Sequence, residues 1–166
     1  MLLRSYRPTD LPILHQIDQA CFPAAVSYSR EELANFIGHR RSRTWIAEED
    51  GRIVGFLVAD RQMHASGHVI TVDVLEEWRH RGVGTQLMEA AEDWARSLGL
   101  HLIYLETSEQ NVTAQRFYSQ RGYEKHRLVE RYYGNGEAAW VMLKWLDPRS
   151  EEPPVRKEEG EDQFRL

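Results

Sequence analysis

The segment that most constrains the fold is a glycine-rich turn between a β-rich run and an amphipathic helix. The run covers residues 68–75, and the helix is predicted from about Gly82 to Ser97, with apolar residues on one stripe. Glycine lets a backbone approach a ligand closely, and the free N–H groups of a first helical turn attract anions. Arg79 and Arg81 in the turn can add charge-assisted hydrogen bonds. The turn therefore predicts a phosphate cradle, and a turn whose glycines only relieve strain is the alternative.

Two other phosphate-binding motifs match this turn less well. A Walker loop needs Gly-Lys followed by Ser or Thr, which the turn lacks. A dinucleotide fingerprint needs a third glycine where the chain has Leu87, although Glu106 has the spacing of its acidic partner. The chain before the turn predicts two helices and a hairpin rather than alternating strands and helices. A dinucleotide-dependent enzyme is therefore the weaker hypothesis.

Periodicity predicts an α/β (α+β) domain over residues 1–146. Strands are expected near residues 2–7, 45–48, 53–59, 68–75, 101–106, 123–132 and 138–146, and helices near 11–21, 29–37, 82–97 and 111–122. Asp50-Gly51 predicts a tight hairpin, and Ser29 with Glu32 predicts a helix-capping box. Strands that mostly neighbour each other in sequence, with helices in two blocks, imply a mixed sheet covered on both faces.

Composition excludes several classes of protein. The 166 residues are 42% hydrophobic and 28% charged, as in ordinary globular chains, which excludes wholesale disorder, collagen and coiled coil. One cysteine allows no intramolecular disulfide, and no apolar run is long enough for a membrane helix, so we expect a cytoplasmic protein without a membrane partner. A net charge of −5 disfavours generic nucleic-acid binding. The seven histidines form no recognisable metal set, so no metal is expected.

The last twenty residues, 147–166, differ from the rest of the chain. They contain three prolines, seven acidic and four basic residues, and almost no apolar ones. This composition is typical of a disordered acidic tail, and a docking tail is the less favoured alternative.

Two motifs in order resemble the GNAT superfamily of acyl-CoA-dependent N-acetyltransferases. They are Arg79-x-x-Gly82-x-Gly84 after a strand, and Asn111-x-x-Ala114-x-x-x-Tyr118 followed by Gly122-Tyr123. The resemblance covers about residues 1–146. It implies a mostly antiparallel sheet of about seven strands, with acetyl-CoA bound in a V-shaped split between the fourth and fifth strands. The implied cofactor-binding residues are Val72, Val74, Arg79, His80, Arg81, Gly82, Val83, Gly84, Thr85 and Asn111.

Within the superfamily, the chain is similar to the ribosomal-protein-alanine and protein N-terminal acetyltransferases. The similarity rests on Tyr104-Leu105-Glu106, on Arg131-Tyr132-Tyr133-x-x-Gly136-Glu137 and on Phe22-Pro23. It implies an acceptor groove lined by Phe22, Pro23, Tyr28, Tyr132 and Tyr133. Exposed edge-strand aromatics are the alternative explanation of the two adjacent tyrosines.

The resemblance also implies two catalytic residues. Glu106 ends an apolar strand, where a half-buried carboxylate can take a proton from the attacking amine directly or through water. Tyr118 is the implied proton donor to the departing thiolate, and a backbone N–H near Val74 is a candidate oxyanion donor. A salt-bridged glutamate and a core tyrosine are the structural alternatives. Asn111 also has the position of a helix cap.

The sequence thus predicts direct transfer of an acetyl group from acetyl-CoA to an amine in a ternary complex. A protein N-terminus is the favoured acceptor, and a small amine or a lysine side chain is the second hypothesis. A non-catalytic CoA-binding module is a third, although such a module should have lost Glu106, Tyr118 or the glycines. We expect a monomer or a weak homodimer.

Overall fold

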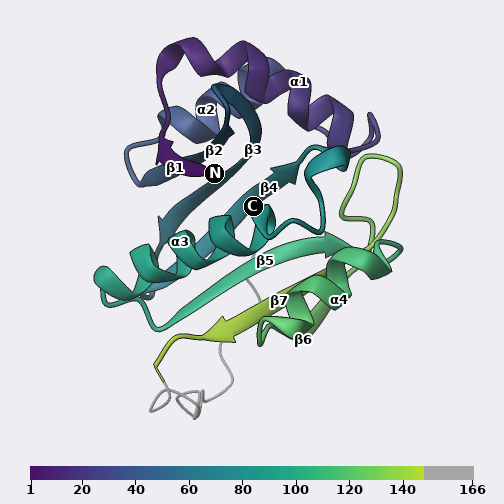
Figure 1. Ribbon diagram of the computed structural model, residues 1–166. Coiled ribbons are helices and arrows are strands. Elements are labelled where there is room, and N and C mark those ends of the chain that lie inside the picture. The colour runs from purple at the N-terminus through teal and green to yellow at the C-terminus, as the bar shows by residue number, and fades with distance from the viewer. Residues whose placement is uncertain (148–166) are drawn as a thin grey trace.

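Within residues 1–147, the part of the chain that the structure describes, seven strands form one sheet in the computed structural model (Figure 1). The strand order is β1-β2-β3-β4-β5-β7-β6, and each neighbouring pair is antiparallel except the parallel pair β4–β5. The bounds are β1 Leu2–Ser5, β2 Ser42–Glu49, β3 Arg52–Gln62, β4 Ser66–Val74, β5 Leu102–Ser108, β6 Glu124–Val129 and β7 Ala139–Trp145. The predicted mixed, mostly antiparallel sheet is confirmed. The predicted tail lies outside the described residues, except Asp147.

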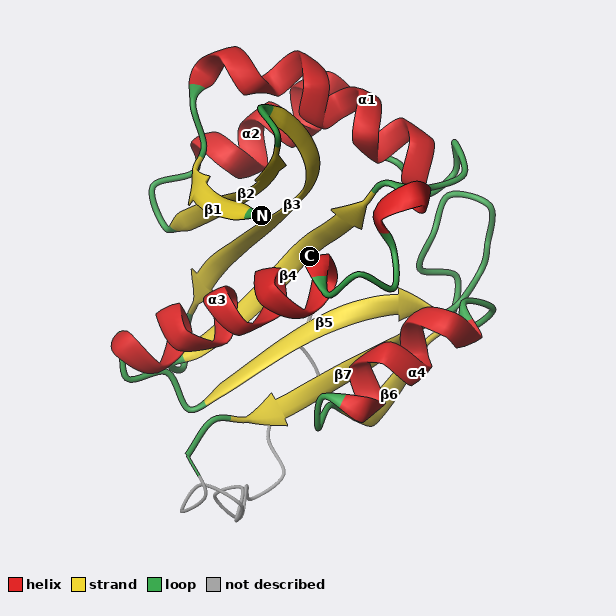
Figure 2. Cartoon of the chain, in the orientation of Figure 1, coloured by secondary structure: helices red, strands yellow, loops and turns green. Residues whose placement is uncertain are grey.

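Helices cover both faces of this sheet (Figure 2). Their bounds are α1 Leu11–Cys21, α2 Arg30–Gly38, α3 Val83–Ser97 and α4 Val112–Gln120, with short 3-10 turns η1 Pro8–Asp10 and η2 Glu76–Trp78. Side chains alternate along β3, so Phe56 packs under α1 and α2 while Leu57 packs under α3. The side chains of Leu87 and Ala91 on α3 are fully buried against that second face. Two apolar layers therefore enclose the sheet.

A β-bulge in β4 prepares the site. Val58 of β3 pairs with Thr71 and the next residue, Ala59, pairs with Val69, so Ile70 is one residue too many. A bulge bends its strand and increases the local twist. Pairing with β5 runs only as far as Val69 opposite Leu105. Beyond that point β4 and β5 no longer pair with each other, as the predicted V-shaped split requires.

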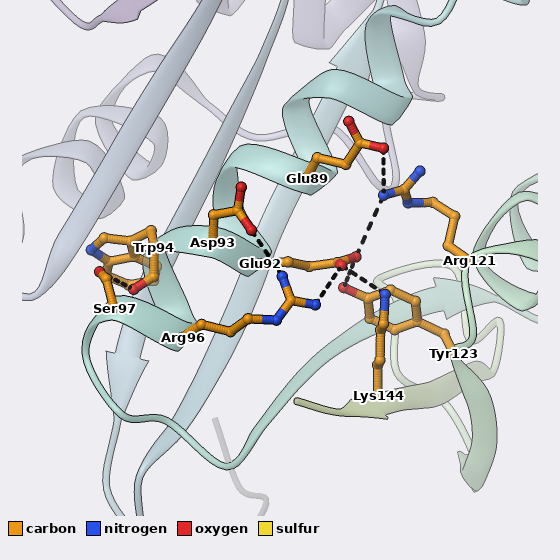
Figure 3. A network of polar contacts seen from close by, with 9 residues as sticks. All are labelled: Glu89, Glu92, Asp93, Trp94, Arg96, Ser97, Arg121, Tyr123 and Lys144. Carbon is orange, nitrogen blue, oxygen red and sulfur yellow. Dashed lines mark hydrogen bonds and ion pairs between the residues drawn. The ribbon is translucent and has the colours of Figure 1, made fainter. Parts of the chain in front are cut away.

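A buried carboxylate on α3 connects this helix with segments from the β5 side of the split. Glu92 on α3 is 3% exposed, and its carboxylate lies 2.7 Å from Lys144 Nζ on β7 (Figure 3). The Tyr123 hydroxyl donates to it at 3.3 Å, and the Arg121 guanidinium lies 3.6 Å away. Burying an unpaired charge costs much free energy, and several hydrogen-bonding partners offset that cost for Glu92. This network ties α3 to the α4–β6 connection and to β7 although the strands part.

Several element boundaries differ from the prediction, among them the start of β2 at Ser42 and the end of β3 at Gln62, each three residues beyond the predicted bound. The first strand ends at Ser5 rather than near residue 7, and α3 begins at Val83, one residue after the left-handed Gly82 (φ 81°). The sixth strand was expected to reach Tyr132, but it ends at Val129, and Arg131 is left-handed at φ 53°. Residues that favour strands, Tyr132 among them, continue into the loop, so propensity alone overextends the strand. The Asp50-Gly51 hairpin and the Ser29–Glu32 capping box are confirmed.

Candidate active site

A cavity of about 880 Å³ opens where β4 and β5 part. It is lined by the first turn of α3, the facing ends of the two strands, the N-terminal part of α4, the α1–α2 loop and the β6–β7 loop. The predicted site residues that line it are Phe22, Pro23, Tyr28, Val72, Val74, Arg79, His80, Gly82, Gly84, Thr85, Glu106, Asn111, Tyr118, Tyr132 and Tyr133. Segments far apart in the sequence thus meet around one space.

The turn before α3 has the geometry of an anion cradle. His80 and Gly82 are both left-handed, at φ 60° and 81°, which folds the backbone tightly. The first intrahelical hydrogen bond runs from the Gln86 N–H to the Gly82 carbonyl. The N–H groups of residues 83–85 therefore have no acceptor within the helix and carry the positive end of its dipole. A Cβ on Gly84 would lie 3.3 Å from the Phe117 ring, so a side chain there would crowd the cavity wall.

Two predicted cofactor-binding residues do not line the cavity. The Arg81 guanidinium lies 5.1 Å from the centre of the Trp78 ring, as in a cation–π contact. Val83 is 2% exposed and packs in the core beneath α3. Arg79 does line the cavity, and its Nε donates to the Val74 carbonyl at 3.0 Å. That bond fixes the turn to the end of β4.

A carboxylate and an imidazole meet across the parallel strands at the bottom of the split. The Oε2 atom of Glu106 lies 2.6 Å from Nε2 of His68, and their side chains are 12% and 6% exposed. The imidazole stacks on the Tyr104 ring, with centroids 4.6 Å apart. Its other nitrogen lies 3.9 Å from the Asp60 carboxylate. The salt-bridge alternative for Glu106 is thus partly right, since its close partner is the side chain of a histidine.

Sequence reasoning missed His68. It lies on β4 with the parallel register His68–Tyr104, two residues short of Glu106 on β5. Only a correct pairing of β4 with β5 could have joined the two, because 38 residues separate them in sequence.

Tyr118 on α4 also lines the cavity. Its ring packs edge-on against Phe117 and Tyr123, at centroid distances of 5.3 and 5.9 Å. Burial raises the pKa of Tyr118 above its usual value, and the charge of Asp73 adds to the rise. The hydroxyl therefore keeps its proton at neutral pH. The Asn111 side chain caps α4 by accepting from the Ala114 N–H at 3.0 Å, which confirms its local role.

Aromatic residues of two loops form the other end of the cavity. Phe22, Pro23 and Tyr28 come from the α1–α2 connection, and Tyr132 and Tyr133 come from the β6–β7 connection. The two adjacent tyrosines pack edge-on at 4.9 Å, and burial raises the pKa of both hydroxyls. These hydroxyls are thus protonated hydrogen-bonding groups in a half-buried groove. They do not lie on an edge strand, so the edge-strand explanation is wrong.

The floor of the groove contains a thiol with little nucleophilic character. Cys21 lines the cavity, and its Sγ donates to the Val74 carbonyl at 3.4 Å. Burial and the nearby charge of Asp73 raise the pKa of Cys21 to about 11. A thiol with such a pKa is almost wholly protonated at neutral pH, so it is a poor nucleophile.

The described residues lack two kinds of structural feature. Residues 1–147 contain no group of three or more His, Cys, Asp or Glu side chains placed to hold a metal ion. In the same range, none of the helices has the length and apolar character needed to span a membrane.

Comparisons with known proteins agree with this geometry. Residues 11–123 match the model of the acetyltransferase (GNAT) family. An uncharacterized N-acetyltransferase of Methanocaldococcus jannaschii is 31% identical over 145 residues, covering 87% of this chain and 91% of the relative. An N-alpha-acetyltransferase of Sulfurisphaera tokodaii is 26% identical over 152 residues, covering 84% and 90%. The crystal structure of the ribosomal-protein-S18-alanine N-acetyltransferase from Escherichia coli covers 95% of this chain and 99% of its own, with a TM-score of 0.79 at 21% identity.

Proposed function

The chain belongs to the acetyltransferase (GNAT) family, and we propose that it acetylates the α-amino group of protein N-termini. The family and its N-acetyltransferase relatives indicate an enzyme that uses acetyl-CoA. The observation that carries the finer proposal is the continuity of one cavity. It joins a phosphate cradle at α3, the parted strands, and a groove lined by tyrosines. Acetyl-CoA held at the cradle and a peptide held in the groove would therefore bring the thioester and the amine together between the parted strands.

The residues of the cradle fit the diphosphate of acetyl-CoA. Gly82 and Gly84 line the cavity without side chains, and the N–H groups of the first turn of α3 have no acceptor within the helix, so they can donate to an anion. Arg79 adds a positive charge beside them. Beyond Val69, β4 still pairs with β3 but no longer with β5. The edge of this stretch that faces β5, which contains Val72 and Val74, offers backbone groups to the amide-bearing arm of the cofactor.

Glu106 is proposed as the general base. An α-amino group has a pKa near 8, so most of it is protonated at neutral pH and must lose a proton before it attacks. The carboxylate accepts that proton, and the imidazole of His68 at 2.6 Å orients it and shares the proton. The nitrogen lone pair then forms a bond to the thioester carbon, and the carbonyl oxygen becomes an oxyanion.

Tyr118 is proposed as the general acid. When the tetrahedral intermediate collapses, the C–S bond breaks and its electron pair leaves on the CoA sulfur. The buried hydroxyl, which keeps its proton at neutral pH, gives that proton to the thiolate. A backbone N–H near Val74 stabilises the oxyanion in the preceding step. As the C–N bond becomes an amide, the nitrogen gives up its second proton, and this proton restores the Tyr118 hydroxyl. The products are then a neutral amide and CoA thiol, with the first proton of the ammonium on Glu106.

The nature of the groove favours a peptide acceptor. Tyrosine hydroxyls on two loops suit the backbone of an extended peptide, whose N–H and C=O groups need partners. The Sulfurisphaera and Saccharolobus relatives are named N-alpha-acetyltransferases. One observation favours a second candidate. Glu106 and Glu137 both line the cavity, and two carboxylates also suit a polyamine.

The test measures CoA release from acetyl-CoA with three panels of acceptors: peptides with free N-termini, polyamines, and lysine peptides with blocked N-termini. We expect rapid release with some free N-termini, loss of release when the same peptide is blocked, and the acetyl group on the first residue by mass spectrometry. Faster turnover with a polyamine or a blocked lysine peptide would favour the second candidate. Tight acetyl-CoA binding without any transfer would support a non-catalytic module.

A further inference from the structure

A second, smaller pocket lies at the far end of α3. It is lined by Arg40, Arg41, Ser42, Arg43, Arg61, Trp94 and Leu98, and its volume is about 260 Å³. We call it the arginine pocket. It shares no residue with the large cavity, which reaches α3 only at its first turn. Thr85 and Trp94 are nine residues apart, so about 14 Å of helix separates the two sites at ~1.5 Å per residue.

The sheet holds three of the arginines on one face. The Arg61 N–H donates to the Arg41 carbonyl at 3.0 Å, one step beyond the Ser42–Asp60 pair of the β2–β3 ladder. Arg41 and Arg61 are therefore opposite one another, and Arg43 lies two residues along on the same face. Like charges directly across two strands repel and destabilise a sheet. Nothing in the fold of the hairpin requires this arrangement.

The described part of the chain does not neutralise these charges. Arginine ion pairs in residues 1–147 are formed by other arginines: Arg4, Arg52, Arg96 and Arg121. The nearest acid in sequence, Asp60, accepts from Gln62 and lies beside His68, on the opposite face of β3 from Arg61. The C-terminal end of α3 contributes only about half a negative charge. A concentrated positive charge thus remains in a chain whose net charge is −5.

Aromatic rings form a rigid wall beside the guanidinium groups. Trp94 and Trp45 pack edge-on at 5.6 Å, and the Arg43 guanidinium lies 5.7 Å from the centre of the Trp45 ring. Such contacts hold an arginine in place without using its N–H donors on a carboxylate. The donors stay available for a ligand.

We propose that the arginine pocket binds a compact anion that carries two phosphate groups. Guanidinium groups bind phosphate oxygens in bidentate fashion, and each phosphate group carries about −1.5 to −2 charges near neutral pH. Two such groups balance the four arginines. The small volume admits a diphosphate rather than a larger ligand. An extended polyanion would leave the pocket and run over a surface whose overall charge is negative.

The test is titration of the full-length protein with inorganic pyrophosphate at low ionic strength, by calorimetry. The protein is first saturated with CoA, which blocks the cradle at the other end of α3. We expect one site, with affinity about tenfold or more weaker in Arg41→Gln/Arg61→Gln. The matched control Arg30→Gln/Arg52→Gln removes the same charge from exposed positions elsewhere and should change the affinity less than about twofold.

A second measurement separates binding from a role in folding. Without pyrophosphate, Arg41→Gln/Arg61→Gln should melt at a higher temperature than the parent, because a repulsive pair is gone. A lower melting temperature, no pyrophosphate binding, or equal weakening in the control would each overturn the proposal. If the pocket bound a short single-stranded RNA but not pyrophosphate, the proposal of a compact ligand would be wrong and an extended polyanion would be the ligand. Acetyl transfer should be unchanged in both double variants, so this outcome is independent of the proposed function.

Discussion

Nε2 of His68 and Oε2 of Glu106 lie 2.6 Å apart, across the last paired residues of two parallel strands. The Tyr104 ring stacks on the imidazole at an interplanar angle of 11°, and the Asp60 carboxylate lies 3.9 Å behind it. The carboxylate that lines the cavity is therefore one end of a row of three side chains, Glu106, His68 and Asp60. The row leads from the split toward the end of β3. In its proposed role as general base, Glu106 is held in place by this contact with His68.

Replacing Glu106 with Gln tests this role. The amide keeps the size of the side chain but cannot accept a proton, so kcat should fall about 10²–10⁴-fold. Acetyl-CoA affinity should change little, because the cradle lies at the other end of the cavity. Steady-state kinetics and calorimetry with acetyl-CoA measure the two quantities. Glu109→Gln, an exposed position just after β5, is the matched control. Retention of half the parent kcat by E106Q would remove Glu106 from the mechanism.

Replacing Tyr118 with Phe removes only the hydroxyl from a buried ring. We expect kcat to fall about 10²-fold or more, because the thiolate then leaves without a positioned proton donor. The dissociation constant of acetyl-CoA should stay within about threefold. Tyr123→Phe is the control in the neighbouring ring. It loses a hydrogen bond to Glu92 and about 1 kcal/mol of stability, but no proposed step uses it. Normal turnover by Y118F would exclude the proton-donor role.

Much of the fold was predictable because its signals are local. The Asp50-Gly51 turn, the Ser29–Glu32 box and the glycines around α3 each act within a few residues, and the structure confirms them. The end of β6 was not predictable in this way. The loop after it still contains strand-favouring tyrosines, and the left-handed Arg131 lies two residues beyond the end of the strand at Val129.

The site was predictable only where a motif runs along one segment. The cradle glycines and Arg79 line the cavity as expected, but the pattern does not say which side chains of the turn face it. The left-handed His80 redirects the chain, so Arg81 stacks on Trp78 instead. His68 was missed because its partner is defined by a parallel strand pair, and no local signal reports such a contact.

Gly84→Glu tests the cradle. A Cβ at this position lies 3.3 Å from Phe117, and the added carboxylate would repel phosphate groups at the start of α3. We expect acetyl-CoA affinity to fall at least about 10²-fold, so that the cofactor no longer raises the melting temperature. Gly38→Glu is the control, since a Cβ there meets nothing within 4 Å. Full thermal protection of the Gly84 variant by acetyl-CoA would show that the cofactor binds elsewhere.

Asp73, on β4, predicts an unusual dependence of stability on pH. It is 1% exposed, Thr71 donates to its Oδ1 at 2.5 Å, and its Oδ2 has no hydrogen-bond partner. Burial raises the pKa of this carboxyl well above its usual value, the nearby Asp18 adds to the rise, and the Thr71 hydrogen bond opposes it. The folded state thus holds a proton that the unfolded state has already lost above about pH 4.

The sign of the effect follows from that difference in bound protons. Between the unfolded and folded pKa values of Asp73, stability falls as pH rises, by up to about 1.4 kcal/mol per pH unit. Asp73→Asn has no proton to lose and keeps an oxygen that accepts from Thr71. The difference between the unfolding free energy of this variant and that of the parent should therefore shift in favour of the variant as pH rises from about 4.5 to 7.5. Urea titrations at each pH measure both free energies. Asp93→Asn, an exposed position on α3, should follow the parent at every pH. Parallel curves for the parent and the Asp73 variant would mean that this carboxyl is ionised in the folded protein.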